Sequence, residues 1–247
     1  MSFEQSSRIV ITGVGASTPL GHSFNEIGDA LQAGRSGIDW YDAGTFNRLQ
    51  KHAAASVQEI LLPAETDSLI HTEQFKKSSR IEQFMIGPAA HALADAGIYP
   101  KDDSFEQKKR VGIIAGIGAE QLKGWERDFL DNGHDVFEAN RHPSLVHRVA
   151  HMLGVNGPAT TVAAACASSG YALALGKIWL ATGLVDSCVV GGCDVLSPTA
   201  LAAFHNLRAL SRRDDDPQKA SRPFDQNRDG FVMGEGGVFF VLERQRA

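Results

Sequence analysis

The sequence predicts an α/β fold with a mainly parallel sheet covered by helices on both faces. Short apolar runs that end in glycines alternate along the chain with longer segments whose apolar residues recur at helical spacing. This alternation is typical of parallel strands joined by helical crossovers. At 247 residues and 43% hydrophobic, the chain can bury a sizeable core, as one large domain or two small ones.

Composition excludes several classes of function. The net charge of −5 gives no basic field for nucleic acid, and no segment approaches the roughly 20 apolar residues of a membrane span. The first residues have no basic region followed by an apolar stretch, so nothing indicates export. Three cysteines without framework spacing indicate reduced thiols. We therefore expect a cytoplasmic protein.

The pattern of the amino-terminal segment predicts a strand followed by a helix. Residues 8–15 form a buried strand pattern that ends in glycines, and residues 24–33 carry apolar residues at helical spacing. The spacing of Gly13, Gly15 and Gly21 is not that of a dinucleotide-binding loop, and no acidic residue follows at the expected distance. The glycines therefore argue against a nucleotide site.

The next segments differ in how strongly their patterns predict secondary structure. Residues 34–72 are irregular, with 39–47 resembling a loop and 51–62 weakly strand-like or helical. By contrast, residues 78–97 predict a helix, because a serine can cap its start and Gly97 ends its apolar pattern. A strand over 111–117 and a helix around 120–130 are expected to follow.

Four histidines lie close together in the sequence, and a helix is predicted over 143–153. His147 and His151 are four residues apart, which on a helix places both on one face, as zinc ligands require. However, there is no accompanying glutamate motif, cysteine pair or third ligand at fixed spacing near them or near His134 and His142. We interpret the four as surface histidines and predict no metal site.

Residues 160–170 are the stretch most suggestive of chemistry. A β-branched run passes through small residues into Cys166 and then into a helical segment, which predicts a strand, a tight corner and a helix. A cysteine at such a corner lies at the positive end of the helix dipole, which favours the thiolate nucleophile. The alternative is a small, buried, apolar cysteine.

The remaining elements complete the alternating pattern. Residues 167–182 are apolar nearly all round and predict a helix that is buried on all sides. Residues 187–194 read as a buried strand that contains Cys188 and Cys193, so neither thiol is expected to be reactive. Residues 236–243 predict a closing strand.

Three stretches together resemble the β-ketoacyl-[acyl-carrier-protein] synthases of fatty acid and polyketide synthesis. They are Ala-Cys-Ala-Ser-Ser at 165–169, Arg-Ala-Leu-Ser at 208–211 and the long motif at 221–236, and the similarity runs in order along nearly the whole chain. The resemblance implies a thiolase-like fold, in which residues 1–247 form one amino-terminal domain, half of a pseudo-duplicated αβαβα architecture. In that family, the strand over 160–162 pairs with its copy in a homodimer.

The resemblance also implies roles for individual residues. Cys166 takes the acyl group from the phosphopantetheine of acyl carrier protein, and a decarboxylated malonyl-carrier then attacks the thioester. The Cys166 N–H would supply half of an oxyanion hole. Phe204 matches a position near the acyl pocket, and Arg208 matches a basic residue that receives the carrier. The alternatives are an ordinary core residue for Phe204 and an ordinary surface charge for Arg208. No bound cofactor or metal is implied.

The resemblance also indicates which catalytic groups of the family this chain does not supply. Asp225, Arg228 and Asp229 fit a buried ion network that holds a glycine turn better than a catalytic group. The family's two catalytic histidines and a lysine come from a second half that resembles the first. None of the nine histidines here lies in a matching stretch, so we expect a missing half or a second chain to supply these groups.

Two other functions remain open from the sequence. A chain-length-type partner keeps the fold without condensing acyl groups, but such partners usually lack the cysteine. Another thiolase-fold acyltransferase would use the same cysteine and pass the acyl group on without decarboxylation. Analysis of the missing half or of the product would separate these functions.

Overall fold

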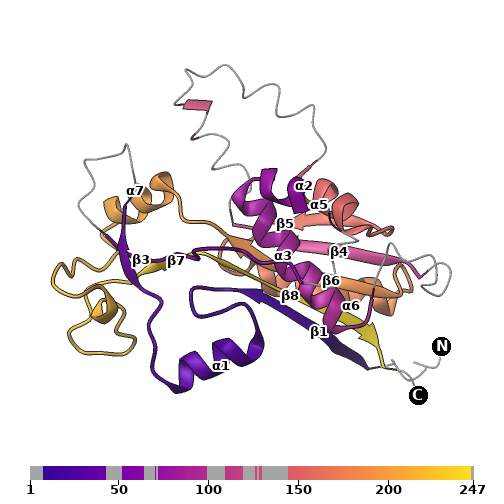
Figure 1. The fold of residues 1–247 in the computed structure, drawn as a ribbon, viewed down its shortest axis with the longest axis horizontal. Coiled ribbons are helices and arrows are strands. Elements are labelled where there is room, and N and C mark those ends of the chain that lie inside the picture. Colours follow the sequence, from indigo (N-terminus) through magenta and orange to yellow (C-terminus); the bar gives the residue numbers. More distant parts are fainter. Residues whose placement is uncertain are drawn as a thin grey trace.

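A five-stranded mixed sheet forms the centre of the computed structural model, which describes residues 8–42, 52–63, 70, 72–98, 109–118, 126, 128–129 and 144–245 (Figure 1). In spatial order the strands are β1 (Ile9–Ser17), β8 (Gly236–Arg244), β6 (Ser187–Asp194), β4 (Val111–Gly116) and β5 (Ala159–Val162). β4 is parallel to β5 and β6, whereas β8 is antiparallel to β1 and β6. The predicted α/β fold is confirmed, with β8 as the one reversed strand of this sheet.

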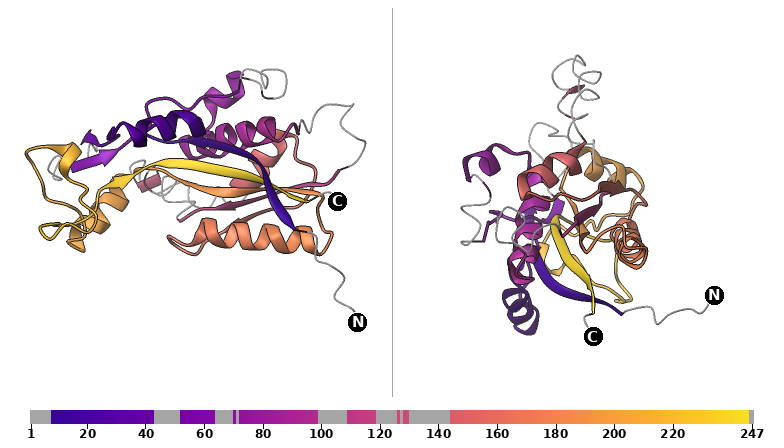
Figure 2. Two further views of the ribbon diagram at one scale, coloured as in Figure 1. Left: turned by 90° about the horizontal axis from the view of Figure 1, so that it is seen from below. Right: turned by 90° about the vertical axis from the view of Figure 1, so that its right-hand side faces the viewer.

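Helices cover both faces of this sheet, as predicted (Figure 2). α3 (Arg80–Asp95) and α5 (Leu145–Leu153) pack on one face, and α6 (Ser168–Ala181) packs on the other. α1 (Phe24–Gln32) lies beside β1, and α2 (Thr72–Lys77) precedes α3. The helices predicted over 24–33, 78–97 and 143–153 are thus confirmed to within two residues at each end. Most of the helix predicted around 120–130 lies outside the described residues.

A second, small sheet lies beyond the carboxyl ends of β4 and β6 (Figure 1). It consists of β2 (Asp39–Tyr41), β3 (His52–Ala55) and β7 (Met233–Gly234), in that order. The expectation of a loop at 39–47 is therefore wrong for β2. A three-residue strand is too short to show the alternating pattern on which strand prediction depends.

Two glycines of β1 allow α3 to lie very close to the sheet. A Cβ added to Gly13 would lie 2.1 Å from the carbonyl oxygen of Ala92, and one added to Gly15 would lie 1.9 Å from that of Pro88. No side chain fits between the strand and the helix at these positions. The glycines therefore serve helix–sheet packing.

The prediction that α6 is buried on all sides is wrong. Ala172, Gly176 and Leu180 face the sheet and are buried, whereas Tyr171 and Ile178 are 60% and 55% exposed. The described part of the chain has one sheet against this helix, so only one of its apolar faces is covered. Among the described helices, none is long and apolar enough to cross a membrane.

Candidate functional site

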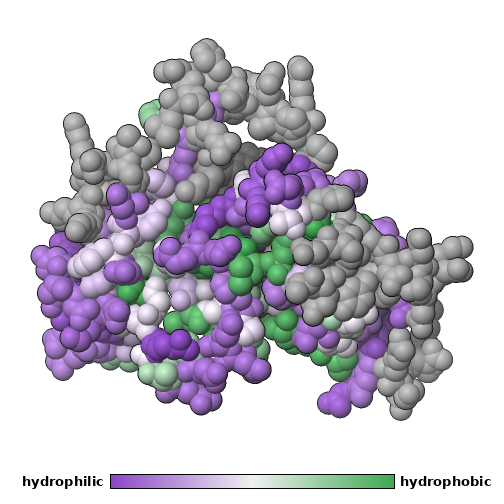
Figure 3. Space-filling view, viewed as in Figure 1, coloured by the Kyte–Doolittle hydropathy of each residue, from purple (hydrophilic) through white to green (hydrophobic). Residues whose placement is uncertain are grey.

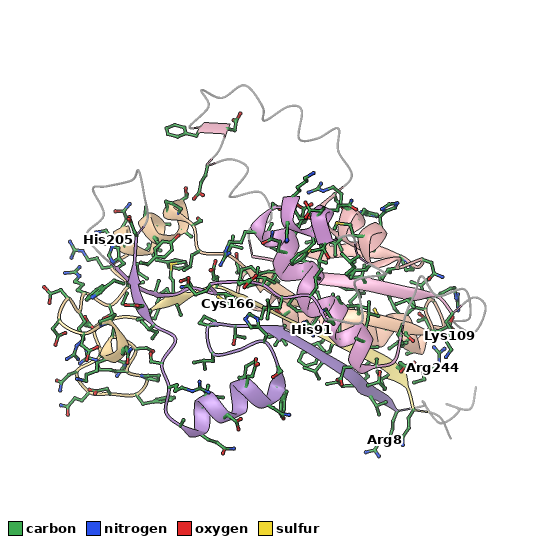
Figure 4. All side chains as sticks on the ribbon, viewed as in Figure 1. Arg8, His91, Lys109, Cys166, His205 and Arg244 are labelled. Carbon is green, nitrogen blue, oxygen red and sulfur yellow. The ribbon has the colours of Figure 1, made fainter. Side chains whose placement is uncertain are left out.

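Cys166 lies in the corner between β5 and α6, as the sequence predicts. β5 ends at Val162 and α6 begins at Ser168, so the amino-terminal end of a 14-residue helix adjoins the cysteine. The Cys166 side chain is exposed. Figure 4 places it near the carboxyl ends of β4 and β6, with Lys109 and Arg244 at the opposite end of the sheet. An exposed thiol at the positive end of a helix has the geometry of a nucleophile.

The corner contains a strained residue and a side-chain clamp, and the sequence alone revealed neither. Ala165, which precedes the cysteine, has a φ of 50°, a left-handed conformation that costs a residue other than glycine about 1–2 kcal/mol. The Ser168 hydroxyl accepts a hydrogen bond from the Ala164 N–H at 2.8 Å and donates one to the Ala165 carbonyl at 2.7 Å. Ser168 is 3% exposed, so these bonds are shielded from water.

Two strand-end glycines hold the start of α6 against the sheet. A Cβ added to Gly116, at the end of β4, would lie 2.5 Å from the carbonyl carbon of Ser168. One added to Gly192, on β6, would lie 2.1 Å from the Ser169 hydroxyl oxygen. The helix terminus therefore contacts strand backbone directly, and this contact fixes the position of the Cys166 corner.

The other two cysteines are buried in β6, as expected. Cys188 is fully buried, and burial raises the pKa of its thiol to about 12. Burial and the nearby Asp194 carboxylate also raise the pKa of Cys193. Both thiols therefore stay protonated at neutral pH, and among the three only Cys166 is exposed.

Phe204 lies on a helix beyond the carboxyl ends of the parallel strands. α7 (Pro198–Asn206) starts with Ser197 as its N-cap, whose side chain accepts a hydrogen bond from the Ala200 N–H at 3.0 Å. The half-buried Phe204 ring meets Phe231 edge to face, with the ring centroids 5.1 Å apart. Figure 4 shows that His205, the next residue of this helix, lies at the same end of the sheet as Cys166. The acyl-pocket role of Phe204 stays a prediction.

Arg208 follows the end of α7 in an unusual backbone conformation. Its φ is 55°, its side chain is exposed, and its N–H donates to the His205 carbonyl at 2.9 Å. The preceding Leu207 is 73% exposed. The turn thus presents a basic side chain and an apolar one together on the surface, where a protein partner has access to them.

The expectation of a buried ion network around Asp225, Arg228 and Asp229 is wrong, because all three residues are exposed. Asp229 does hold the chain before Gly230: it accepts hydrogen bonds from the Ser211 hydroxyl, the Arg212 N–H and the Arg222 guanidinium at 2.8–2.9 Å. Figure 3 shows that hydrophilic residues gather over this part of the surface, at the left of the view. The network is therefore a surface turn.

The buried carboxylate of this region is Glu235, which was not among the functional residues predicted from the sequence. It is 7% exposed and accepts hydrogen bonds from the N–H of Val57 at 3.0 Å, the N–H of Leu196 at 3.3 Å and Nε of Arg80 at 3.1 Å. It thus links α3 to the segments that follow β3 and β6. Its place between Gly234 and Gly236 in the long motif was the only signal in the sequence.

Two histidines from distant parts of the sequence also meet near α7. The rings of His52, on β3, and His205 contact edge to face, with centroids 5.2 Å apart. Nε2 of His52 is buried and has no hydrogen-bond partner among the described residues. Burial, with a smaller contribution from His205, lowers the pKa of His52. Neither residue had a distinguishing pattern in the sequence.

The surface interpretation is confirmed for two of the four clustered histidines. His147 and His151 lie on the exposed side of α5, while His134 and His142 lie outside the described residues. Within the described ranges, no three histidine, cysteine or acidic side chains lie close enough together to hold a metal ion.

Comparison with known proteins gives one consistent family. The sequence model of the β-ketoacyl synthase N-terminal domain matches residues 6–247. A putative polyketide β-ketoacyl synthase 1 from Streptomyces halstedii is 33% identical, and the match covers 96% of this chain and 58% of that protein. A 3-oxoacyl-[acyl-carrier-protein] synthase 2 from Synechocystis is 30% identical over 97% of this chain and 58% of its own length.

Solved structures of the same family share the fold. A β-ketoacyl synthase from Burkholderia phymatum superposes with a TM-score of 0.78 at 29% identity, over 97% of this chain and 59% of that one. The ishigamide ketosynthase/chain length factor superposes with a TM-score of 0.75 at 27% identity, over 96% of this chain and 58% of that one. The chain spans less than three fifths of the length of these relatives.

Proposed function

The chain belongs to the β-ketoacyl synthase family, and we propose that it carries the acyl-accepting nucleophile, Cys166, of a β-ketoacyl-[acyl-carrier-protein] synthase. The observation that supports this most directly is the exposure of Cys166 at the start of α6, while Cys188 and Cys193 are buried in β6. The family motif and an accessible thiol thus coincide at one residue.

In the first proposed step, the Cys166 thiolate attacks the thioester carbonyl of an acyl group carried on phosphopantetheine. A bond forms between sulfur and the carbonyl carbon, and negative charge develops on the carbonyl oxygen. The Cys166 N–H stabilises this oxyanion as one half of the hole. The intermediate collapses, the phosphopantetheine thiolate leaves and takes up a proton, and the acyl group remains on Cys166.

In the second proposed step, a malonyl group loses carbon dioxide, and the resulting carbanion attacks the Cys166 thioester. A carbon–carbon bond forms, and the Cys166 thiolate leaves. The enolate oxygen formed during decarboxylation needs hydrogen-bond donors, which the family takes from histidines of its second half. We therefore expect the 247 residues alone to accept an acyl group without condensing it.

Carrier protein and a second polypeptide segment are the proposed partners. A solved neighbour, 25% identical with a TM-score of 0.77, is a ketosynthase in complex with its acyl-carrier protein. The exposed Arg208 would contact the acidic carrier, and Phe204 would line the acyl pocket. No cofactor beyond the carrier's own phosphopantetheine is required by this chemistry.

The experiment is acyl transfer followed by peptide mass mapping. The chain is incubated with an acyl phosphopantetheine thioester at neutral pH, and a Cys166→Ala variant serves as the control. We expect one acyl group on the Cys166 peptide and none in the variant. Label mainly on Cys188 or Cys193, or none despite rapid alkylation of Cys166 by iodoacetamide, would contradict the proposal.

A second arm tests condensation and separates the alternative functions. The acylated chain receives malonyl-carrier, and carbon dioxide and β-ketoacyl product are measured. Transfer of the acyl group onward to a thiol acceptor without decarboxylation, even after a second half is supplied, would identify another thiolase-fold acyltransferase. Turnover by the 247 residues alone, abolished in Cys166→Ala, would show that the site is complete without the second half.

A further inference from the structure

Ser168 bridges two successive peptide groups of the Cys166 corner. Its hydroxyl accepts from the Ala164 N–H at 2.8 Å and donates to the Ala165 carbonyl at 2.7 Å. Its own N–H donates to the same carbonyl at 3.2 Å. The Ala165 carbonyl therefore receives two hydrogen bonds from one residue, and the orientation of the peptide between Ala165 and Cys166 is fixed by them.

The conformation that these bonds hold is one that the backbone alone disfavours. Ala165 has a φ of 50°, and a residue other than glycine stays in this region only where its surroundings enforce it. The peptide that carries the Ala165 carbonyl also carries the Cys166 N–H. If Ala165 relaxed to an ordinary conformation, that N–H would turn, and the Cys166 side chain would turn with it.

We infer that Ser168 is a positioning residue. Its hydroxyl clamps Ala164 and Ala165 and so holds both the N–H and the sulfur of Cys166 in the orientation that acyl transfer requires. This inference rests on the proposed role of Cys166 as acyl acceptor. Ser168 acts through the backbone and does not touch the substrate. Thr182, at the opposite end of α6, donates its exposed hydroxyl to the Ile178 carbonyl at 2.9 Å, so Thr182→Ala is a control that removes a similar hydrogen bond far from the corner.

The clamp affects thioester chemistry more than simple alkylation. In acyl transfer, negative charge develops on the carbonyl oxygen and is stabilised by a correctly oriented N–H. In alkylation, the thiolate displaces iodide and no oxyanion forms, so the orientation of that N–H matters much less. Loss of one oxyanion donor costs about a hundredfold to a thousandfold in rate. We therefore expect Ser168→Ala to lower the rate of Cys166 acylation about a hundredfold and to change its alkylation rate only a few fold.

The test compares Ser168→Ala, Ser168→Thr and Thr182→Ala in both reactions. Ser168→Thr keeps the hydroxyl and is expected to recover most of the acylation rate, and Thr182→Ala is expected to match the parent chain. An acylation rate in Ser168→Ala close to that of the parent, or an equal loss in acylation and alkylation, would overturn the inference. Where Ser168→Ala fails to fold, Ser168→Cys keeps the volume with a weak donor.

Hydrogen exchange of the Ala164 amide gives a readout that does not depend on activity. This N–H is expected to be protected in the parent chain and in Ser168→Thr, and to exchange faster in Ser168→Ala while the rest of α6 is unchanged. Unaltered protection in Ser168→Ala would show that there is no clamp. If the parent chain accepts no acyl group, the proposed function fails, and amide exchange still decides whether Ser168 holds the corner.

Discussion

The backbone of Ser168 rests directly on Gly116: a Cβ placed on this glycine would lie 2.5 Å from the Ser168 carbonyl carbon and 2.5 Å from the Ser169 nitrogen. Both atoms belong to the main chain, so no side-chain rotation would relieve the overlap. The first turn of α6 and the end of β4 are therefore fitted to each other. The position of Cys166, two residues before α6, depends on this fit.

Gly116→Ala is expected to displace the start of α6 and to slow Cys166 chemistry. Overpacking of this kind typically destabilises a protein by about 1–3 kcal/mol. We expect a loss of that size in urea unfolding and at least a tenfold slower acylation of Cys166, because misplaced reacting groups lose about a hundredfold in rate per ångström. Gly170→Ala is the matched control, since among the described residues no atom outside its own stretch of helix lies within 4 Å of its added Cβ. Equal acylation rates in the two variants would contradict this account.

Glu235→Ala is expected to destabilise the chain strongly, because it removes the shared acceptor of Arg80 and of two backbone N–H groups. Removing one partner of a buried, hydrogen-bonded ion pair costs about 3–5 kcal/mol. Arg80 is partly exposed, so we expect about 2–3 kcal/mol in urea unfolding. Asp215→Ala breaks the exposed ion pair with Arg213 and is expected to have a much smaller effect. A small effect of Glu235→Ala would show that the buried site readily rearranges.

His52 is expected to make the chain less stable in mild acid. Burial and the charge of His205 lower its pKa in the folded state, so the unfolded chain binds the proton more readily. Stability from this group is therefore fully present above the unfolded value of about 6.5 and is lost as the pH falls below it. Urea unfolding at about pH 7.5 and about pH 5.5 should show a smaller difference in His52→Gln than in the parent. His151→Gln, at an exposed position on α5, should leave the difference unchanged.

The sequence predicts the elements that carry long, periodic patterns. β6 matches the predicted strand at 187–194, and α1, α3 and α5 lie where apolar spacing and capping residues place them. The Cys166 corner is also predictable, because β-branched, small and helix-forming residues follow one another there. These signals are local in the chain, so they can be read without knowing which segments meet in space.

Features that depend on contacts between distant segments are not predictable in this way. Glu235 is buried because Val57, Arg80 and Leu196 converge on it, and nothing near Glu235 in the sequence indicates that meeting. His52 and His205 are separated by most of the chain. The exposed face of α6 was missed for a related reason, since composition shows that a helix is apolar but not what covers it.

The last prediction concerns β5, which forms an edge of the described sheet. The carbonyls of Pro158 and Val162 accept hydrogen bonds from Ile113 of β4 at 3.0 Å and from Ile117, directly after β4, at 3.1 Å. Because bonding direction alternates along a strand, the N–H and C=O groups of Ala159 and Thr161 point to the open side. An edge with free donors and acceptors is a template for pairing with another strand. In the family that the chain resembles, this strand pairs with its copy, so we expect a homodimer built across β5.

Thr161→Pro tests this dimer, because proline removes the outward N–H without affecting the bonds to β4. The matched control is Thr161→Val, which keeps the N–H and the β-branched shape. Light scattering at micromolar concentration should show a dimer for the parent and for Thr161→Val, and a monomer for Thr161→Pro with an unchanged circular dichroism spectrum. A monomeric parent would exclude the dimer. A dimeric Thr161→Pro would place the contact elsewhere, and the apolar side chains exposed on α6, Tyr171 and Ile178, would then be the next surface to substitute.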